Sequence, residues 1–86
     1  MASLDYSAYP ELAVVLLAME GNQQAFAELV RRKQGWLRGF LRYCCGNDAQ
    51  ADDLSQQSFI LAWRKISQLR KPESFHSWLK RLALNT

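Results

Sequence analysis

Residues 48–66 read DAQADDLSQQSFILAWRKI, and the prediction of the fold starts from their pattern. Its apolar and small side chains recur every three or four residues, at Ala51, Leu54, Ser55, Ser58, Phe59, Ala62, Trp63 and Ile66. That spacing places them on one face of a helix. Acidic residues stand in the first turn, and Arg64 and Lys65 stand near the end, as the helix macrodipole favours. The stretch therefore predicts an amphipathic helix with one face turned to a core.

The residues before this stretch predict a longer helix that ends at Gly46. Asn47 and Gln50 resemble a capping box that starts the helix described above, and Asn22 is placed to cap the longer one. A single stripe follows three- and four-residue spacing, interrupted only at Lys33: Ala25, Phe26, Leu29, Val30, Lys33, Trp36, Leu37, Phe40, Leu41 and Cys44. Gly35 and Gly39 lie inside it, where each costs about 1 kcal/mol relative to Ala, so we expect close helix packing there.

Two shorter helices complete the prediction. One follows Pro10 and ends at Gly21, with an apolar stripe at Leu12, Val15, Leu16 and Met19. The other follows the loop at residues 68–74 and starts at a capping Ser74. No useful β-alternation is present, so we predict an all-α fold, a compact four-helix bundle with two long and two shorter helices. Residues 1–9 are expected to form an N-terminal tail and residues 10–86 the domain.

Composition narrows the class of protein. The chain has 86 residues, 49% of them hydrophobic, which suits one domain with a modest core. No apolar run approaches the ~18 residues of a membrane span, and the N-terminus lacks the basic region of a signal peptide, so we expect a cytoplasmic protein without membrane insertion. The adjacent Cys44 and Cys45 are poorly placed to bridge each other, and a single histidine argues against a Cys/His zinc site. We expect no metal and no cofactor.

Charge divides the chain into two parts. Residues 1–30 carry four acids and no Lys or Arg, a net charge of −4, whereas residues 31–86 carry all eleven Lys and Arg against four acids, a net charge of +7. This asymmetry indicates a polyanionic partner for the second part. A solvated basic face is an equally good explanation of the charge alone.

A catalytic site is not indicated. His76 is the only histidine, and its neighbour Ser77 does not form a dyad with it through adjacency alone. Asp52 and Asp53 are also adjacent, so they diverge on a helix and do not share a proton. No glycine-rich loop is present to cradle phosphate. We therefore predict that the chain is not an enzyme.

The core does not explain two groups of side chains. Asp53, Gln56, Gln57 and Ile60 follow a 0, 3, 4, 7 spacing and share one helix face, which suits docking of another helix, although a plain solvated face has the same pattern. The second group mixes cations with rings, as single-stranded nucleic acid requires. It comprises Trp63, Arg64, Lys65, Arg70, Lys71, Phe75, His76, Trp78, Lys80 and Arg81. Trp63 and Trp78 fit core positions better than stacking positions, and Phe75 fits either.

Residues 48–66 resemble the most recognisable segment of extracytoplasmic-function (ECF) sigma factors, the promoter-specificity subunits of bacterial RNA polymerase. The family pattern is approximately D-x-x-x-A-E-D-L-x-Q-E-x-F-x-x-A-W, matched at Asp48, Asp53, Leu54, Gln56, Phe59, Ala62 and Trp63. The upstream GNQQAFAELVRRKQGWLRGFLRY is similar to the family's G-D-x-x-A-F-x-x-L-x-x-x-Y stretch. The closing SFHSWLKRLALNT resembles F-x-x-W-L-x-x-I-A-x-N, matched at Phe75, Trp78, Leu79, Leu82, Ala83 and Asn85.

The resemblance implies a sigma region 2 domain with two partners. The first is the β′ clamp coiled coil of the polymerase core, contacted by Asp53, Gln56, Gln57 and Ile60. The second is the non-template strand of the promoter −10 element, which the domain recognises and melts. By position, its contacts fall on the Gln68–Ser74 loop with Arg70 and Lys71, and on Phe75, His76, Lys80, Arg81 and Asn85. An anti-sigma factor is a further partner implied by the family.

The chain departs from the family pattern at several positions. Gln57 replaces a Glu, which weakens or alters the β′ contact, and Lys80 replaces an aromatic residue, which exchanges stacking for phosphate attraction. Ser55 and Ser58 replace residues that are commonly aliphatic. Nothing in the chain corresponds to the family's second domain, which reads the −35 element, so we expect an excised domain. The alternative is a helical protein-interaction domain without DNA recognition, such as an inhibitor-bound regulatory module.

Overall fold

The residues predicted as helix caps set the ends of the two long helices. In the computed structural model, which describes residues 5–86, α2 (Gln23–Cys45) begins where the Asn22 side chain accepts a hydrogen bond from the Ala25 N–H, 2.9 Å away. It ends at Gly46, whose φ of 70° lies in the left-handed region that favours glycine. Asn47 then caps α3 (Asp48–Lys65) by accepting from the Gln50 N–H at 2.9 Å. These predicted boundaries are confirmed.

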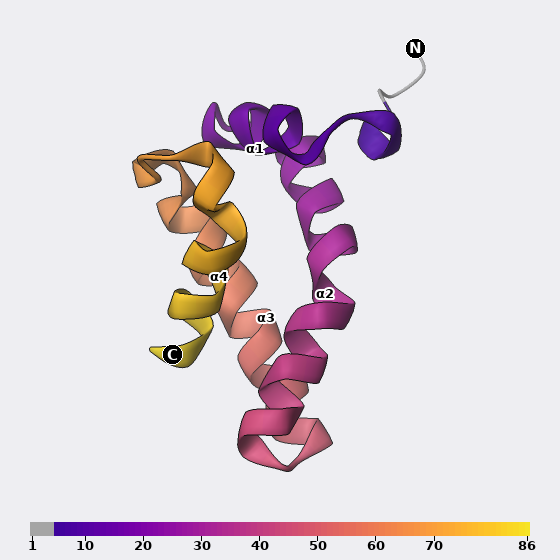
Figure 1. Ribbon diagram of the computed structural model, residues 1–86, viewed down its shortest axis with the longest axis vertical. Helices are drawn as coiled ribbons and strands as arrows, with labels where there is room; N and C mark the ends of the chain where they lie inside the picture. The colour runs from indigo at the N-terminus through magenta and orange to yellow at the C-terminus, as the bar shows by residue number, and fades with distance from the viewer. Residues whose placement is uncertain (1–4) are drawn as a thin grey trace.

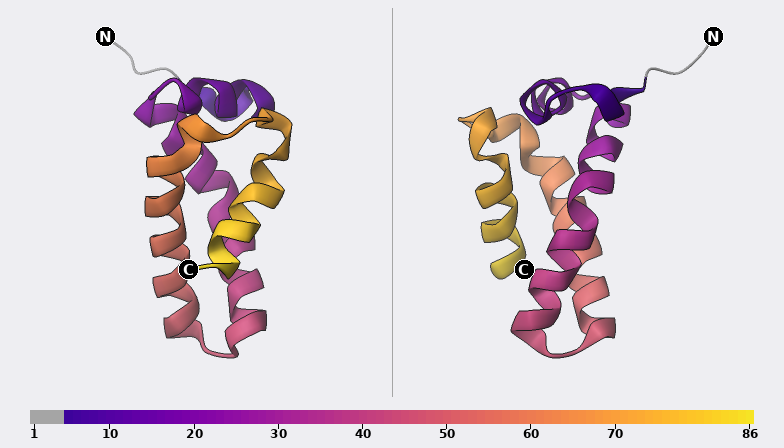
Figure 2. Two further views of the ribbon diagram at one scale, coloured as in Figure 1. Left: turned by 90° about the vertical axis from the view of Figure 1, so that its left-hand side faces the viewer. Right: turned by 45° about the vertical axis from the view of Figure 1, so that its right-hand side comes forward.

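The two shorter helices are α1 (Glu11–Met19) and α4 (Phe75–Leu84), and within residues 5–86 no strand is present. The all-α prediction, with two long and two shorter helices, is confirmed. Figure 1 shows α2 and α3 as an antiparallel hairpin, with α1 lying across one end of it. In both views of Figure 2, α4 runs back along α3 after the turns Ile66–Gln68 and Pro72–Ser74. None of the helices described here is long and apolar enough to cross a membrane.

The core lies where the four helices meet. Its largest fully buried apolar side chains come from α1, α2, α4 and the turn after α3: Val14, Val15, Leu29, Leu37, Ile66, Phe75 and Leu79. The two serines that replace aliphatic residues of the family pattern are buried as well. Ser58 is compensated there, because its hydroxyl donates to the Leu54 carbonyl at 2.6 Å.

The inward face of α1 differs from the prediction. Spacing had assigned this face to Leu12, Val15, Leu16 and Met19. The structure buries Val14, Val15 and Ala18, and leaves Leu12 and Leu16 nearly half exposed. Residues 11–19 are apolar almost all round, so spacing alone does not identify the face, which is set by how α1 crosses α2 and the turns after α3.

The predicted tail is partly folded. Residues 1–4 lie outside the described residues, but Tyr6 is only 5% exposed and its hydroxyl accepts from the Asn22 side chain at 2.9 Å. Arg32 donates to the backbone carbonyls of Tyr6 and Tyr9, at 3.0 and 2.6 Å, and pairs with the buried Glu28. This network ties residues 6–9, before α1, to α2.

Candidate functional site

One face of α3 is free of the core. Asp53, Gln56 and Gln57 are exposed, and the Ile60 side chain is 56% exposed, which is unusual for a large aliphatic residue. Within residues 5–86, Asp53 forms no ion pair. The face therefore offers a carboxylate and two amides around a small apolar centre, as the sequence predicted.

Grooves between α2 and α3 flank Ile60 on both sides. One, of about 480 Å³, lies toward Phe26 and Trp63, whose ring centroids are 5.0 Å apart. The other, of about 420 Å³, is lined by Val30, Gln56 and Phe59 among others. Phe59 and Ile60 line both grooves, so the exposed α3 face continues into an apolar floor on each side.

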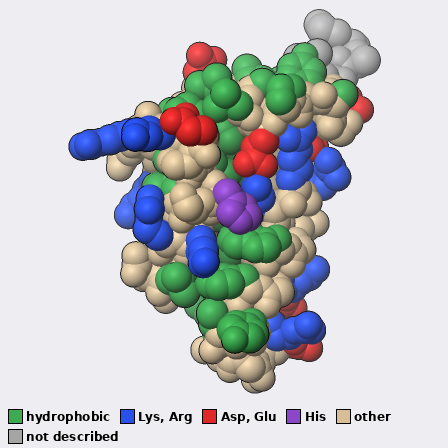
Figure 3. All heavy atoms as spheres, viewed as in Figure 1, with side chains coloured by type: hydrophobic (Ala, Val, Ile, Leu, Met, Phe, Trp, Pro, Cys, Tyr) green, Lys and Arg blue, Asp and Glu red, His purple; other side chains and the backbone are tan. Residues whose placement is uncertain are grey.

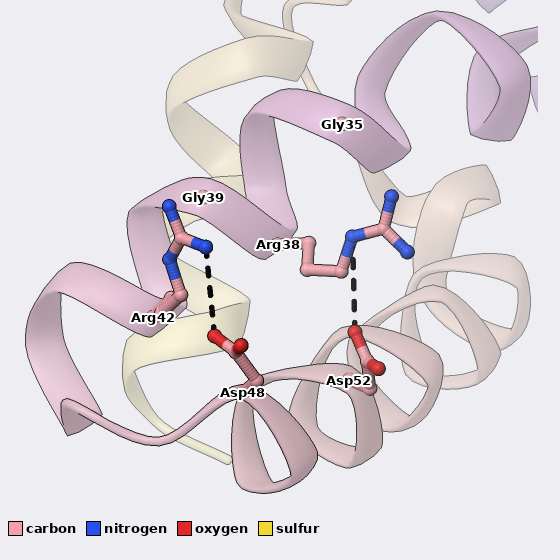
Figure 4. Close-up of a pocket in the computed structure, with 6 residues that line it drawn as sticks. All are labelled: Gly35, Arg38, Gly39, Arg42, Asp48 and Asp52. Carbon is pink, nitrogen blue, oxygen red and sulfur yellow. Dashed lines mark ion pairs between the residues drawn. The ribbon is translucent and has the colours of Figure 1, made fainter.

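The second of these grooves continues into a polar hollow of about 350 Å³ between the lower turns of α2 and α3 (Figure 4). Arg38 pairs with Asp52 at 3.7 Å and Arg42 with Asp48 at 3.5 Å across it. Gly35 and Gly39 also line it, and a Cβ at either glycine would have no neighbour within 4 Å. The predicted close helix packing at these glycines is therefore wrong, because this side of α2 faces solvent.

A second hollow lies at the turn between α3 and α4. It measures about 330 Å³ and is lined by Gln68, Leu69, Arg70, Lys71, Ser74, Trp78 and Arg81. Three of the predicted nucleic-acid residues, Arg70, Lys71 and Arg81, thus come together around one concave surface. Leu69 is buried and anchors the loop, while the three cations are exposed. Ser74 does not cap α4 as predicted, because its hydroxyl donates back to the Lys71 carbonyl at 2.7 Å.

The remaining exposed residues of α4 turn toward α2. His76 lies over Trp36, with ring centroids 4.0 Å apart, and its Nδ1 is 3.1 Å from Lys33 Nζ. Lys80 Nζ stands 5.0 Å from the centroid of the Phe40 ring, within range of a cation–π contact. Figure 3 shows the histidine in purple beside lysine or arginine side chains and above a band of hydrophobic ones. His76 and Lys80 therefore belong to a different surface from Arg70, Lys71 and Arg81.

The protonation of His76 follows from these neighbours. Burial lowers the pKa of His76 below its usual value, and the nearby charge of Lys33 lowers it further. The imidazole is therefore neutral at pH 7, and its Nδ1 is free to accept a hydrogen bond from the Lys33 ammonium.

Phe75 is the predicted nucleic-acid residue that the structure places elsewhere. Its side chain is 1% exposed and packs in the core, with its ring centroid 5.9 Å from that of Trp78. A ring enclosed in this way is not available to stack on a base. Phe75 is therefore a core residue rather than the nucleic-acid contact that was predicted. Asn85 is exposed and directly follows α4, where its N–H donates to the Arg81 carbonyl at 3.1 Å.

Trp36 and Phe40 were missed as surface residues. Spacing had assigned them to the buried stripe of α2, but both are half-buried and contact the exposed side of α4. Trp63 and Trp78 also pack partly buried against the core, as predicted. Among the residues that the structure describes, no group of His, Cys, Asp or Glu side chains is placed to hold a metal ion.

Comparison with known proteins places this arrangement in a family. Residues 29–86 match the family described as Sigma-70 region 2. The chain belongs to the sigma-70 region 2 family. Its relatives further support an ECF sigma factor region 2, in agreement with the resemblance seen in the motifs. Since sigma factors are initiation factors without enzymatic activity, the prediction that the chain is not an enzyme is confirmed.

Several curated relatives are sigma factors. The chain is 41% identical over 75 residues to the ECF RNA polymerase sigma-E factor of Haemophilus influenzae, which covers 86% of this chain and 39% of the relative. It is 33% identical over 66 residues to the RNA polymerase sigma-H factor of Pseudomonas aeruginosa, and the matched stretch covers 77% of this chain and 34% of the relative. It is 34% identical over 79 residues to the RNA polymerase sigma factor CnrH of Cupriavidus metallidurans, covering 88% and 41%. The chain thus spans about two fifths of the length of these relatives. No solved structure shows a significant match.

Proposed function

We propose that the chain is the part of an ECF sigma factor that binds the RNA polymerase core through the β′ clamp coiled coil and recognises and melts the promoter −10 element. The observation that carries the proposal is that two exposed surfaces of suitable chemistry lie on one scaffold. The α3 face around Ile60 and the hollow around Arg70 share no lining residue. The site of action would be the cytoplasm, where the polymerase works.

The α3 face suits the docking of a helix from a basic partner. Asp53 supplies a charged acceptor, and Gln56 and Gln57 supply both donors and acceptors. Ile60 and the groove floors on each side provide the apolar centre that a helix-in-groove contact requires. Gln57 stands where the family pattern has Glu, so this chain would use a hydrogen bond where an ion pair is usual.

The hollow at the α3–α4 turn suits a single strand with an extruded base. Arg70, Lys71 and Arg81 surround it, and cations at this density neutralise phosphates. The half-buried Trp78 lines the same hollow and offers a ring beside the cations. A base turned out of the duplex would enter the hollow from the loop side.

Two matched sets of variants test this function. Arg70→Ala and Lys71→Ala should each weaken binding of a single-stranded −10-like oligonucleotide and reduce the salt slope of the binding constant by about 1. The control Arg42→Ala removes an exposed cation from the C-terminal end of α2, which does not line the Arg70 hollow. It should leave the salt slope unchanged. Equal loss in all three variants would show a non-specific charge effect and contradict the proposed site.

The polymerase contact is tested separately. Gln56→Ala should weaken binding to a β′ coiled-coil fragment at least fivefold, about 1 kcal/mol, while Gln24→Ala, an exposed amide on α2, should not change it. Gln56→Ala should also leave oligonucleotide affinity unchanged. Undiminished β′ binding by Gln56→Ala would contradict the assignment of this face.

A helical protein-interaction domain without DNA recognition is the second candidate. Three large side chains on or beside α1 favour it, because Tyr9, Leu12 and Leu16 are 41%, 47% and 46% exposed. An anti-sigma factor would be a partner of this kind. Equal affinity for template and non-template oligonucleotides, together with tight binding of such an inhibitor, would favour this second function.

A further inference from the structure

Lys33 interrupts the apolar stripe of α2, and no contact of the proposed function uses it. Its side chain is only 13% exposed, so a charged group is largely enclosed at this position. A cation enclosed in this way needs partners that take the place of water. The structure supplies one partner from α1 and another from α4.

The Lys33 ammonium is held between a carboxylate and an imidazole. On one side, Lys33 Nζ pairs with Glu11 Oε1 of α1 at 2.8 Å. On the other side, it lies 3.1 Å from Nδ1 of His76 in α4. Figure 3 shows the histidine at the surface with basic and acidic side chains close to it. Three helices therefore meet at one charged atom.

The contact between Lys33 and His76 depends on a single proton. An ammonium group donates hydrogen bonds and accepts none, so it can bind His76 only while Nδ1 carries no proton. Protonation of Nδ1 turns the imidazole into a cation with two N–H donors. Two positive groups would then stand 3.1 Å apart, and like charges at that distance repel. The hydrogen bond is therefore lost when His76 is protonated.

Charged groups on all three helices act on His76. Burial of its ring is the largest cause that lowers its pKa, and the charges of Lys33 on α2 and Lys80 on α4 lower it further. Glu11 on α1 raises the pKa, but its carboxylate is already paired with Lys33. Trp36 offers the protonated ring a cation–π contact, since the two ring centroids are 4.0 Å apart. The net effect favours the neutral imidazole at pH 7.

The position of His76 gives this contact a structural consequence. His76 lies in the first turn of α4, and its ring covers part of the half-buried Trp36 on α2. Helix α4 packs chiefly against α3, so side chains such as His76 and Lys80 make its contacts with α2. A His76 side chain that leaves Lys33 removes one of these contacts and uncovers the Trp36 ring.

We propose that Lys33 and His76 form a proton-controlled latch between α2 and α4. The latch is closed while the imidazole is neutral and accepts a hydrogen bond from Lys33. Protonation opens it, because the imidazolium moves away from the Lys33 ammonium and off the Trp36 ring. The opened latch adds a positive charge to the exposed side of α4 and exposes an aromatic ring on α2.

An NMR titration of the isotope-labelled chain tests the latch. The chain contains one histidine, so its ring signals are assigned without ambiguity. The titration runs from about pH 8 to about pH 5, the range in which an imidazole changes its charge. The midpoint should lie below 6.5, and nuclear Overhauser effects between the His76 and Trp36 rings should disappear below that midpoint. The Trp63 ring, which packs against Phe26, should keep its contacts throughout.

Two lysine variants show whether Lys33 drives the opening. Lys33→Met keeps an unbranched side chain and removes the charge, so it should raise the His76 midpoint and leave the protonated ring on Trp36. Lys80→Met is the matched control. It removes the other cation near His76, which has a smaller effect on the pKa, and should raise the midpoint less.

A variant that does not titrate measures the energetic effect of the latch. His76→Gln keeps a hydrogen-bond acceptor for Lys33 and stays neutral at every pH of the titration. The folding equilibrium constant of the unchanged chain should fall with pH by up to about tenfold for each unit by which the midpoint lies below the value in the unfolded chain. His76→Gln should lack this part of the pH dependence in urea unfolding.

Three results would overturn the latch. The first is a His76 midpoint at or above 6.5, which would mean that Glu11 and Trp36 outweigh Lys33. The second is persistence of the contact between His76 and Trp36 through the midpoint, because the ring would then titrate in place. The third is an equal rise of the midpoint in Lys33→Met and Lys80→Met. None of these measurements uses polymerase or nucleic acid, so the latch is tested independently of the proposed function.

Discussion

Replacing Phe75 tests whether this ring belongs to the core or to a nucleic-acid surface. Its side chain is 1% exposed at the start of α4, where it packs against Trp78 and the fully buried core. Phe75→Ala deletes most of the buried ring and leaves a cavity, which should cost about 3–5 kcal/mol of unfolding free energy. A chain of 86 residues has a total stability of about 4–13 kcal/mol, so this loss is a large share of it.

The milder Phe75→Leu keeps part of the volume and should cost about 1–2 kcal/mol. Each kcal/mol lowers the melting temperature of a domain of this size by about 4–8 °C. Urea and thermal unfolding followed by far-UV circular dichroism measure both variants. Leu84→Ala is the matched control, because Leu84 lies on the same helix but is 54% exposed, and it should change stability by less than about 0.5 kcal/mol.

Oligonucleotide binding by the folded Phe75→Leu variant completes the test. Because Phe75 does not reach a base, the folded variant should bind within about twofold of the unchanged chain, less than the loss of one stacked base. A core role for Phe75 is excluded if Phe75→Ala has an unfolding free energy within about 1 kcal/mol of the unchanged chain while oligonucleotide binding is lost. That result would mean that the ring leaves the core to stack.

Three further predictions follow from the burial and charge of other side chains. The guanidinium groups of Arg31 and Arg32 lower the pKa of Glu28 from 4.5 to about 2. The stabilising contribution of Glu28 should therefore be complete above pH 4.5 and lost as the pH falls toward 2. Glu28→Gln should flatten that part of an acid-unfolding curve. Gly39→Ala should stabilise the chain by about 0.5–1 kcal/mol in urea unfolding, since a Cβ there meets open space; a destabilised variant would show unsuspected packing. Burial lowers the pKa of His76 below 6.5, so as the pH falls the histidine is protonated in the unfolded chain before it is protonated in the folded chain. Stability should therefore decline as the pH falls from 6.5 toward the folded-state pKa. An NMR titration midpoint of His76 at or above 6.5 would contradict this prediction.

Local signals in the sequence predicted the helix boundaries well. Asn22, Asn47 and Gly46 act within a few residues of themselves, through side-chain caps and a left-handed backbone conformation. The exposed face of α3 was equally predictable from the sequence, because its polar residues lie opposite an apolar stripe at helical spacing.

Features that depend on tertiary packing were less predictable. The apolar helix α1 offers several faces of similar hydrophobicity, so only its contacts decide that Leu12 and Leu16 stay exposed. The burial of Phe75 and of Trp36 was mispredicted in opposite directions. Phe75 looked available beside a basic loop and is buried, whereas Trp36 fitted a core stripe and lies half-buried against His76.

The candidate site was predicted as a set of residues but not as a geometry. The sequence grouped His76 and Lys80 with Arg70, Lys71 and Arg81 by proximity along the chain. Residues 76 and 80 share one side of α4, and residue 81 points to another, so the helix divides them between α2 and the loop hollow. This division depends on where α4 packs, which spacing within α4 does not specify.

Under the proposed function, polymerase and nucleic acid contact separate surfaces of this domain. A single titration tests it most directly: fluorescence anisotropy of a labelled single-stranded −10-like oligonucleotide, measured at low salt with and without a saturating β′ coiled-coil fragment. If the surfaces are separate, the oligonucleotide should bind equally well or more tightly when the fragment is bound. Displacement of the oligonucleotide in step with fragment occupancy would contradict it.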